Sequence, residues 1–280
     1  MNNVKTAGLL ALMAVLLFWV VYALGGGFGL ALIFAFGFNI VAYFFSDKMA
    51  LAMSRAKPVT EAELPEVYAI VRRLTTATGM PMPRIYVINS PQPNAFATGR
   101  NPKHAAVAVT TGILQILDYD ELEGVLGHEL AHVRNRDILI SSVAAMIGSA
   151  IAILSRMAFW FGRGDNRNNP LGIVGVLASL IIGPIAAMLI RFAISRTREF
   201  QADKSGAEIT GQPLKLASAL QKISAGAARI PMEVNPATAQ LFIENPLKAI
   251  RGGGVMKLFS THPPSEERIR RLTEMAMGMR

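Results

Sequence analysis

Two almost wholly apolar segments near the start of the chain, residues 7–25 and 28–45, constrain its fold more than any other feature. Each approaches the roughly 20 residues that a helix needs to cross the hydrocarbon core of a bilayer. With 52% apolar residues and a mean hydropathy of +0.37, the chain is too apolar for an ordinary soluble domain. The first segment lacks a small-x-small cleavage site and the second follows at once, which favours a retained anchor over a cleaved signal peptide. We therefore predict a two-helix transmembrane hairpin over residues 1–46.

Basic residues around this hairpin predict its orientation. The turn between the two segments carries no charge, Lys5 precedes the first segment, and three basic residues follow the second: Lys48, Arg55 and Lys57. By the positive-inside rule, both ends of the hairpin lie in the cytoplasm. The polar residues 47–137 are then expected to be cytoplasmic as well.

Two further apolar runs, residues 138–161 and 171–194, predict a second hydrophobic hairpin over residues 138–195. Such a hairpin returns the chain to the cytoplasm. Arg156 and Arg191 lie within or at the edges of its runs, so a shallow position in the membrane or packing against the soluble part is an open alternative.

The net charge of +9 would suit a nucleic-acid partner. However, the basic residues flank hydrophobic segments and form no stripe with interleaved aromatic residues, so we expect anionic lipid headgroups and no nucleic acid as their partners. The chain contains no cysteine, which excludes disulfides, thiolate metal sites and a cysteine nucleophile.

A helix is predicted across the sequence HELAH. Asp118 and Glu121 have the spacing of a capping box, and an apolar stripe at helical spacing follows them: Leu122, Val125, Leu126, Leu130 and Val133. On this helix His128 and His132 project from nearly the same face, about 40° apart around the axis. The pattern is HExxH, in which two neutral imidazoles hold zinc and the glutamate, here Glu129, acts as general base toward water.

A third metal ligand must come from elsewhere, because a catalytic zinc usually has three protein ligands. The metzincin pattern is rejected, since Ile138 stands where that class has a histidine. Downstream, the segment SRTREFQADKSGAEITG predicts a helix with Glu199 and Asp203 on one face. Glu199 could complete a His-His-Glu site, and Asp203 could orient a ligand histidine. From the residues alone, a solvated charged face is an open alternative.

The order of two N-terminal spans, HELAHVRNRD, a hydrophobic hairpin, SRTREFQAD and STHPPSEERI resembles the HtpX heat-shock proteases. These are membrane zinc endopeptidases, distantly related to the zinc-dependent CAAX prenyl protease, and the likeness covers nearly the whole chain. The resemblance implies one zinc ion per chain, Glu129 as the catalytic base, Asp203 as the partner of a ligand histidine, and three zinc ligands: His128, His132 and Glu199.

The resemblance also implies roles for residues outside these two helices. His262 and Arg268 would lie across the cleft, with His262 donating to the oxyanion as it forms and Arg268 supporting that arrangement. Read by itself, His262 is more readily a loop histidine. The motif NAFATG similarly implies that Asn94 and Ala95 contact the substrate backbone, although Asn94 after Pro93 is as readily a turn residue.

The remaining polar segments predict a small sheet and several helices. A sheet beside an HExxH helix is the usual gluzincin arrangement, and its edge could accept an extended peptide as an added strand. The double proline before residue 265 predicts a short helix with Ile269 and Leu272 inward. The other predicted elements are helices at 58–79 and 213–225, strands at 84–88 and 105–110, a strand or turn at 94–99, and a loop, lid or disordered segment at 226–254.

The sequence thus predicts an α+β integral membrane protein, mainly helical, with about four transmembrane helices and a cytoplasmic gluzincin-type protease domain that contains a small sheet. The protease parts are residues 47–137 and 196–280. The predicted function is zinc-dependent cleavage of membrane proteins or unfolded polypeptides at the cytoplasmic face of the membrane, and the resemblance adds quality control under stress.

Parts of the sequence would also suit two other classes of protein. An intramembrane metalloprotease would place its motif inside an apolar span, whereas charged residues stand on both sides of this one. A catalytically idle adaptor or chaperone would not need the complete set of expected catalytic residues.

Overall fold

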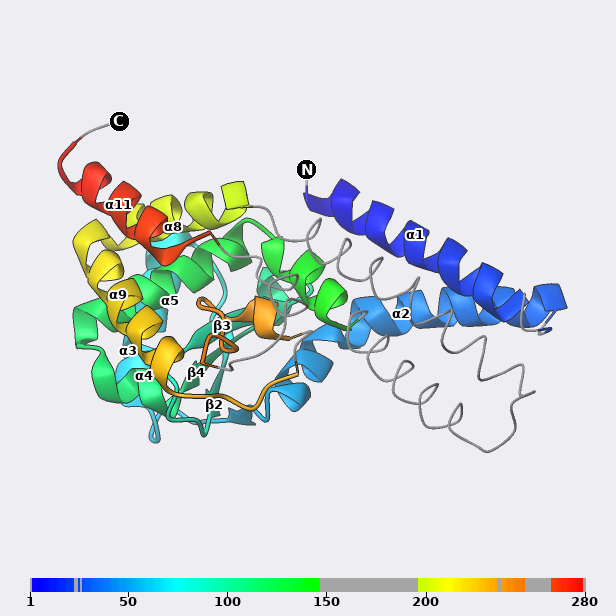
Figure 1. Cartoon of the computed structure of the whole chain (residues 1–280), viewed down its shortest axis with the longest axis horizontal. Coiled ribbons are helices and arrows are strands. Elements are labelled where there is room, and N and C mark those ends of the chain that lie inside the picture. The colour runs from blue at the N-terminus through cyan, green and yellow to red at the C-terminus, as the bar shows by residue number, and fades with distance from the viewer. Residues whose placement is uncertain are drawn as a thin grey trace.

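The computed structural model describes residues 2–22, 25, 27–146, 196–235, 238–249 and 263–278. Helices α1 (Asn2–Val21) and α2 (Gly27–Met53) lie side by side and project from a rounded body that the other elements form (Figure 1). The body is mainly helical and contains one small mixed sheet, as the sequence predicts.

The projecting pair has the surface expected of helices that meet lipid. Within the described residues, α2 is the helix that is long and apolar enough to cross a membrane. Its side chains Phe28, Ile33 and Phe36 are 65%, 69% and 63% exposed, and large apolar side chains exposed along such a length require an apolar neighbour. The second predicted hairpin falls mainly on residues 147–195, outside the described residues.

The predicted boundary at residue 46 lies inside α2, which continues without a break into the body. Ala50 and Leu51, near its end, are buried in an apolar cluster with Phe96 of the sheet. Arg84 donates a hydrogen bond of 2.8 Å to Asp47. One helix therefore joins the lipid-type surface directly to the sheet.

The sheet has the strand order β1-β2-β4-β3, and its bounds are β1 (Lys57–Pro58), β2 (Arg84–Ile88), β3 (Ala95–Gly99) and β4 (Ala105–Thr110). β2 and β4 are parallel, and the other two pairs are antiparallel. Along β4, Val107 and Val109 face the main helical core, whereas Ala106 and Ala108 face the end of α2. The two firmly predicted strands are confirmed, and residues 95–99 form a strand and not a turn.

Helices cover the other face of the sheet and enclose the main core. Their bounds are α3 (Pro65–Thr78), α4 (Thr111–Ile116), α5 (Tyr119–Arg134), α8 (Arg196–Thr210), α9 (Pro213–Arg229) and α11 (Ser265–Ala276). In α11, Leu272 is buried in the core and Ile269 packs against it, as predicted. The short η2 (Pro102–His104) precedes β4.

The predicted helix over residues 58–79 begins too early. Pro58 pairs with β2 as part of β1, and the amide and hydroxyl of Thr60 donate to Glu63 in a turn. The helix begins at Pro65, whose missing amide hydrogen costs nothing at this position. Gly79, in the left-handed region with φ of 66°, ends it.

The predicted loop at 226–254 is irregular within its described residues except at its start, which completes α9, and at η3 (Ala239–Leu241). Phe242, just after η3, is fully buried and packs edge-on against Phe96 with ring centroids 5.0 Å apart. This segment therefore lies against the edge strand β3.

Candidate metal centre and active site

The HExxH motif lies on α5 where this helix crosses α8. A methyl group at Gly206 of α8 would lie 2.7 Å from the backbone nitrogen of His128, so the close approach depends on the absence of a side chain there. Glu199 and Asp203 share the face of α8 that holds this glycine and are 5% and 4% exposed. Lys204 on this helix is exposed, as a solvated charged face would require. Glu199 and Asp203 are buried, so the alternative of a solvated face is wrong for these two residues.

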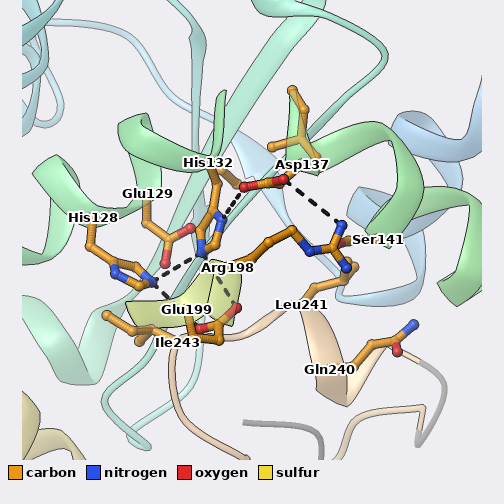
Figure 2. A pocket seen from close by; sticks show the side chains of 12 residues that line it. His128, Glu129, His132, Asp137, Ser141, Arg198, Glu199, Gln240, Leu241 and Ile243 are labelled. Atoms are coloured by element: carbon orange, nitrogen blue, oxygen red, sulfur yellow. Dashed lines mark hydrogen bonds and ion pairs between the residues drawn. The ribbon is translucent and has the colours of Figure 1, made fainter. Parts of the chain in front are cut away.

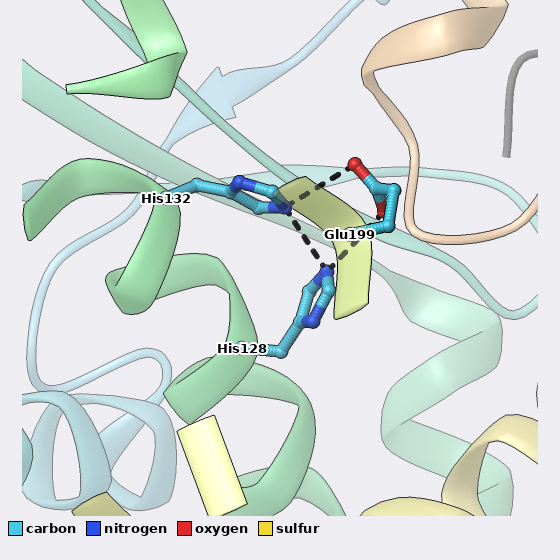
Figure 3. Close-up of side chains that lie close together, drawn as sticks. All are labelled: His128, His132 and Glu199. Atoms are coloured by element: carbon cyan, nitrogen blue, oxygen red, sulfur yellow. Dashed lines mark hydrogen bonds and ion pairs between the residues drawn. The ribbon is translucent and has the colours of Figure 1, made fainter. Parts of the chain in front are cut away.

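Three side chains converge where the two helices cross (Figure 3). The Nε2 atoms of His128 and His132 are 3.2 Å apart, and carboxylate oxygens of Glu199 lie 3.9 Å and 3.6 Å from them. One potential ligand atom from each residue lies within 4.8 Å of the others. Two imidazoles and one carboxylate form the donor set of a catalytic zinc site that leaves a coordination position open.

His128 is held from behind by a buried ion pair. Its Nδ1 lies 2.9 Å from Asp203, which leaves Nε2 directed toward Glu199. Arg268 of α11 donates to both oxygens of Asp203, at 2.8 Å and 2.7 Å. Burial alone would raise the pKa of Asp203, but Arg268 and His128 lower it to about 2. The carboxylate is therefore charged and fixes both the tautomer and the orientation of His128.

His132 has a corresponding partner that the sequence reasoning missed. Its Nδ1 lies 3.2 Å from Asp137, which follows the end of α5. Arg136, with φ of 58°, turns the chain back so that Asp137 comes beneath the histidine. An acidic residue just beyond the second histidine of the motif was the signal in the sequence.

The electrostatics of the cluster suit a divalent cation. Burial outweighs the hydrogen bond with Asp203 and lowers the pKa of His128 to about 4, so its imidazole is neutral and able to bind metal. Burial also favours neutral His132, but Glu199 and Asp137 outweigh it and raise its pKa to about 9. The same excess of carboxylate charge that stabilises a proton on His132 would stabilise a metal ion in its place.

Glu129 is placed to exchange protons beside this cluster. The residue is 2% exposed and lies in the same pocket as Ala97 of β3. Burial and the nearby Glu199 raise its pKa to about 7, against the opposing effect of His132. A carboxylate that titrates near neutral pH can both accept and return a proton, as general acid–base catalysis requires.

A pocket extends from this cluster toward a second group of polar residues (Figure 2). The end of the pocket at this cluster contains the two histidines, Glu129 and Glu199. At the other end, the guanidinium of Arg198 lies near Ser141, with Gln240 beyond it. Like Asp137, Arg198 is a residue of the site that the sequence did not predict.

Two predicted site residues were expected on the opposite side of the cleft. Arg268 is 1% exposed and binds Asp203 and the carbonyl of Ile243, so it lies behind His128 and not across the cleft. The resemblance alone implied the place across the cleft, whereas the buried charge of Asp203 attracts the guanidinium to the other side of His128. His262 lies outside the described residues.

Asn94 and Ala95 are both buried and bound to the chain itself. The Asn94 side-chain amide donates to the carbonyl of Glu244 at 2.8 Å, and the Ala95 carbonyl accepts from Ile243 at 2.9 Å. Contact of these two residues with substrate stays a prediction, and it would require residues 243–244 to move. Ala97, one step along the same edge of β3, lines the pocket.

Sequence comparisons identify a peptidase family and two similar proteins. The model of peptidase family M48 matches residues 61–276. A protease HtpX homolog of Thermodesulfovibrio yellowstonii is 52% identical over 99% of this chain and 99% of its own length. A protease HtpX homolog of Pelotomaculum thermopropionicum is 49% identical over 99% of this chain and 100% of its own.

Among solved structures, the crystal structure of S. mikatae Ste24p superposes with a TM-score of 0.53. The match covers 94% of this chain and 62% of Ste24p, and 18% of the aligned residues are identical. At that identity the likeness concerns the fold alone.

Proposed function

The chain belongs to peptidase family M48 and is a membrane-associated metallopeptidase, and from this premise we propose that it is a zinc-dependent endopeptidase with its active site at the cytoplasmic face. The observation that carries the proposal is the convergence of His128, His132 and Glu199 beside the buried carboxylate of Glu129. M48 peptidases are in general zinc-dependent, and the donor set fits zinc.

The protein residues divide the chemistry between binding and proton transfer. His128, His132 and Glu199 would hold the zinc ion, which supplies a Lewis acid for the scissile carbonyl and for water. Glu129 accepts the proton of the attacking water and returns it to the amine that leaves. No covalent bond between enzyme and substrate is needed.

The proposed substrates are membrane proteins, misfolded ones among them, and unfolded polypeptides that expose a segment in the cytoplasm. The direct junction of α2 with the sheet supports this, because it keeps the pocket close to the lipid-type surface. A role in quality control under stress is proposed from the resemblance to the HtpX proteases.

Removal of zinc tests the enzymatic proposal. Detergent-purified protein treated with a chelator should lose casein cleavage, and added zinc should restore it. We expect zinc to bind again because the metal-free cluster carries an excess of negative carboxylate charge. Metal content and cleavage are measured on the same samples. If the protein binds no zinc, the motif does not hold zinc in this chain, and the adaptor function is favoured. Cleavage that persists without metal would also contradict the proposal.

The orientation has its own test, which the absence of cysteine makes simple. Lys204→Cys places a thiol at an exposed site of α8, and Gly29→Cys places one near the start of α2. In intact cells an impermeant maleimide should leave Lys204→Cys unlabelled and should label it in inverted membrane vesicles. The reverse labelling pattern would place the active site on the outer face. Gly29→Cys, near the opposite end of the span, is the control and should be labelled in intact cells.

A further inference from the structure

Arg198 is a charged residue of the pocket that the proposed chemistry does not use. It precedes Glu199 on α8, and its side chain extends past His132 to the far end of the pocket (Figure 2). Only 8% of the residue is exposed. By contrast Arg196, on the same turn of the helix, is exposed to solvent.

The guanidinium of Arg198 has charge compensation but unfilled hydrogen-bond donors. Its Nη1 lies 3.8 Å from Asp137, which offsets the charge but is too far for a hydrogen bond. Within the part of the chain that the structure describes, neither Nη1 nor Nη2 has a hydrogen-bond partner. Buried donors are almost always paired, so two adjacent unpaired groups that line a pocket indicate a missing acceptor.

The chemistry of the surroundings limits what this acceptor can be. A second carboxylate would lie beside Asp137, whose negative charge already compensates the arginine. A neutral oxygen would fill the donors without that repulsion. Every polypeptide in a protease cleft offers such an oxygen in its main-chain carbonyl groups, whatever its side chains.

We propose that Arg198 is a substrate-binding residue that donates hydrogen bonds to a main-chain carbonyl of the bound polypeptide, in a subsite beyond His132. The inference rests on the proposed peptidase function and adds a subsite to it. Because the hydrogen bonds are made to the main chain of the substrate, the subsite selects extended, unfolded segments and does not depend on their side chains. The subsite positions the chain relative to the metal centre and takes no part in proton transfer.

A double-mutant cycle between enzyme and substrate tests the proposal. A fluorogenic peptide that the wild type cleaves is compared with analogues in which single carbonyl groups near the scissile bond are replaced by methylene. Removing a hydrogen bond from a charged donor costs on the order of 10- to 100-fold. Arg198→Met should lower kcat/KM by that factor on the parent peptide. On the one analogue that lacks the partner carbonyl, the same substitution should have almost no effect.

Controls separate this function from a structural one. Arg196→Met removes an exposed arginine from the same helix and should leave both kcat/KM and zinc content unchanged. If Arg198→Met does not accumulate, Arg198→Lys keeps the charge beside Asp137 and allows the same comparison.

Two outcomes would overturn the assignment. An equal loss on every analogue means that Arg198 acts only through Asp137, and a loss confined to peptides with acidic side chains or a free α-carboxylate means that the site binds carboxylate. Failure of the zinc-loaded wild type to cleave any peptide or casein would instead contradict the peptidase function itself.

Discussion

Glu129→Gln is expected to lower peptide cleavage by roughly two to four orders of magnitude, the usual contribution of a general base. The substitution preserves the size of the side chain and one acceptor oxygen but removes the group that accepts a proton. Burial raises the pKa of Glu129 to about 7, so its carboxylate can accept a proton near neutral pH. The side-chain amide of glutamine cannot. Zinc content should not change, because the proposed metal ligands are His128, His132 and Glu199 and do not include Glu129. Turnover of casein and metal content of the same purified samples are the measurements.

Glu208→Gln is the matched control, since it makes the same chemical change at an exposed position of α8. It should cleave like the wild type. A Glu129→Gln protein that binds zinc and retains full activity in cells would remove the catalytic role of this glutamate. That result would favour the adaptor or chaperone function over the peptidase.

Arg268→Met is expected to destabilise the protein more than any other single change considered. It leaves the carboxylate of Asp203 buried without its bidentate partner, and breaking a buried ion pair in this way costs about 3–5 kcal/mol. For a chain of this size, the midpoint of thermal unfolding should fall by roughly 10 °C. Zinc affinity should also fall, by about 10- to 100-fold, because Asp203, which orients His128, loses the arginine that holds its carboxylate. Thermal unfolding in detergent at fixed zinc concentration and zinc titration measure the two effects.

Arg270→Met provides the comparison, because Arg270 lies on the same helix but pairs with Glu267 and Glu274 at the surface. It should leave the midpoint nearly unchanged. Combining Arg268→Met with Asp203→Asn removes both charges and should recover part of the lost stability. If Arg268→Met and Arg270→Met have equal effects, the buried ion pair does not stabilise the site as described.

Features that depend on short stretches of chain could be predicted well. The capping box of Asp118 and Glu121 is present at the start of α5, because its two hydrogen bonds join residues within one turn. The helical period alone places His128 and His132 on one face. The strands at residues 84–88 and 105–110 were likewise evident from β-branched and apolar composition. The helix at 58–79 was placed too early because the pairing that extends residues 57–58 comes from β2, far along the chain.

Glu199, the candidate third ligand, shows what short stretches of sequence do not determine. Helical spacing puts Glu199 and Asp203 on one face of α8, but it leaves open whether that face meets solvent or α5. The resemblance to a known family supplied the answer before the structure did. In physical terms, the answer depends on the close crossing at Gly206, a contact between segments that are distant in sequence.

The partners of the site residues depended on packing throughout. Asp137 meets His132 through a turn with positive φ, Arg268 reaches Asp203 from another helix, and residues 243–244 occupy the edge where Asn94 and Ala95 were expected to meet substrate. Local sequence therefore specified the apolar segments, the metal-binding helix and the chemical types in the site. Tertiary structure decided which charged groups became buried together, because periodicity assigns a residue to a face of its own element, whereas only the packed fold determines what that face contacts.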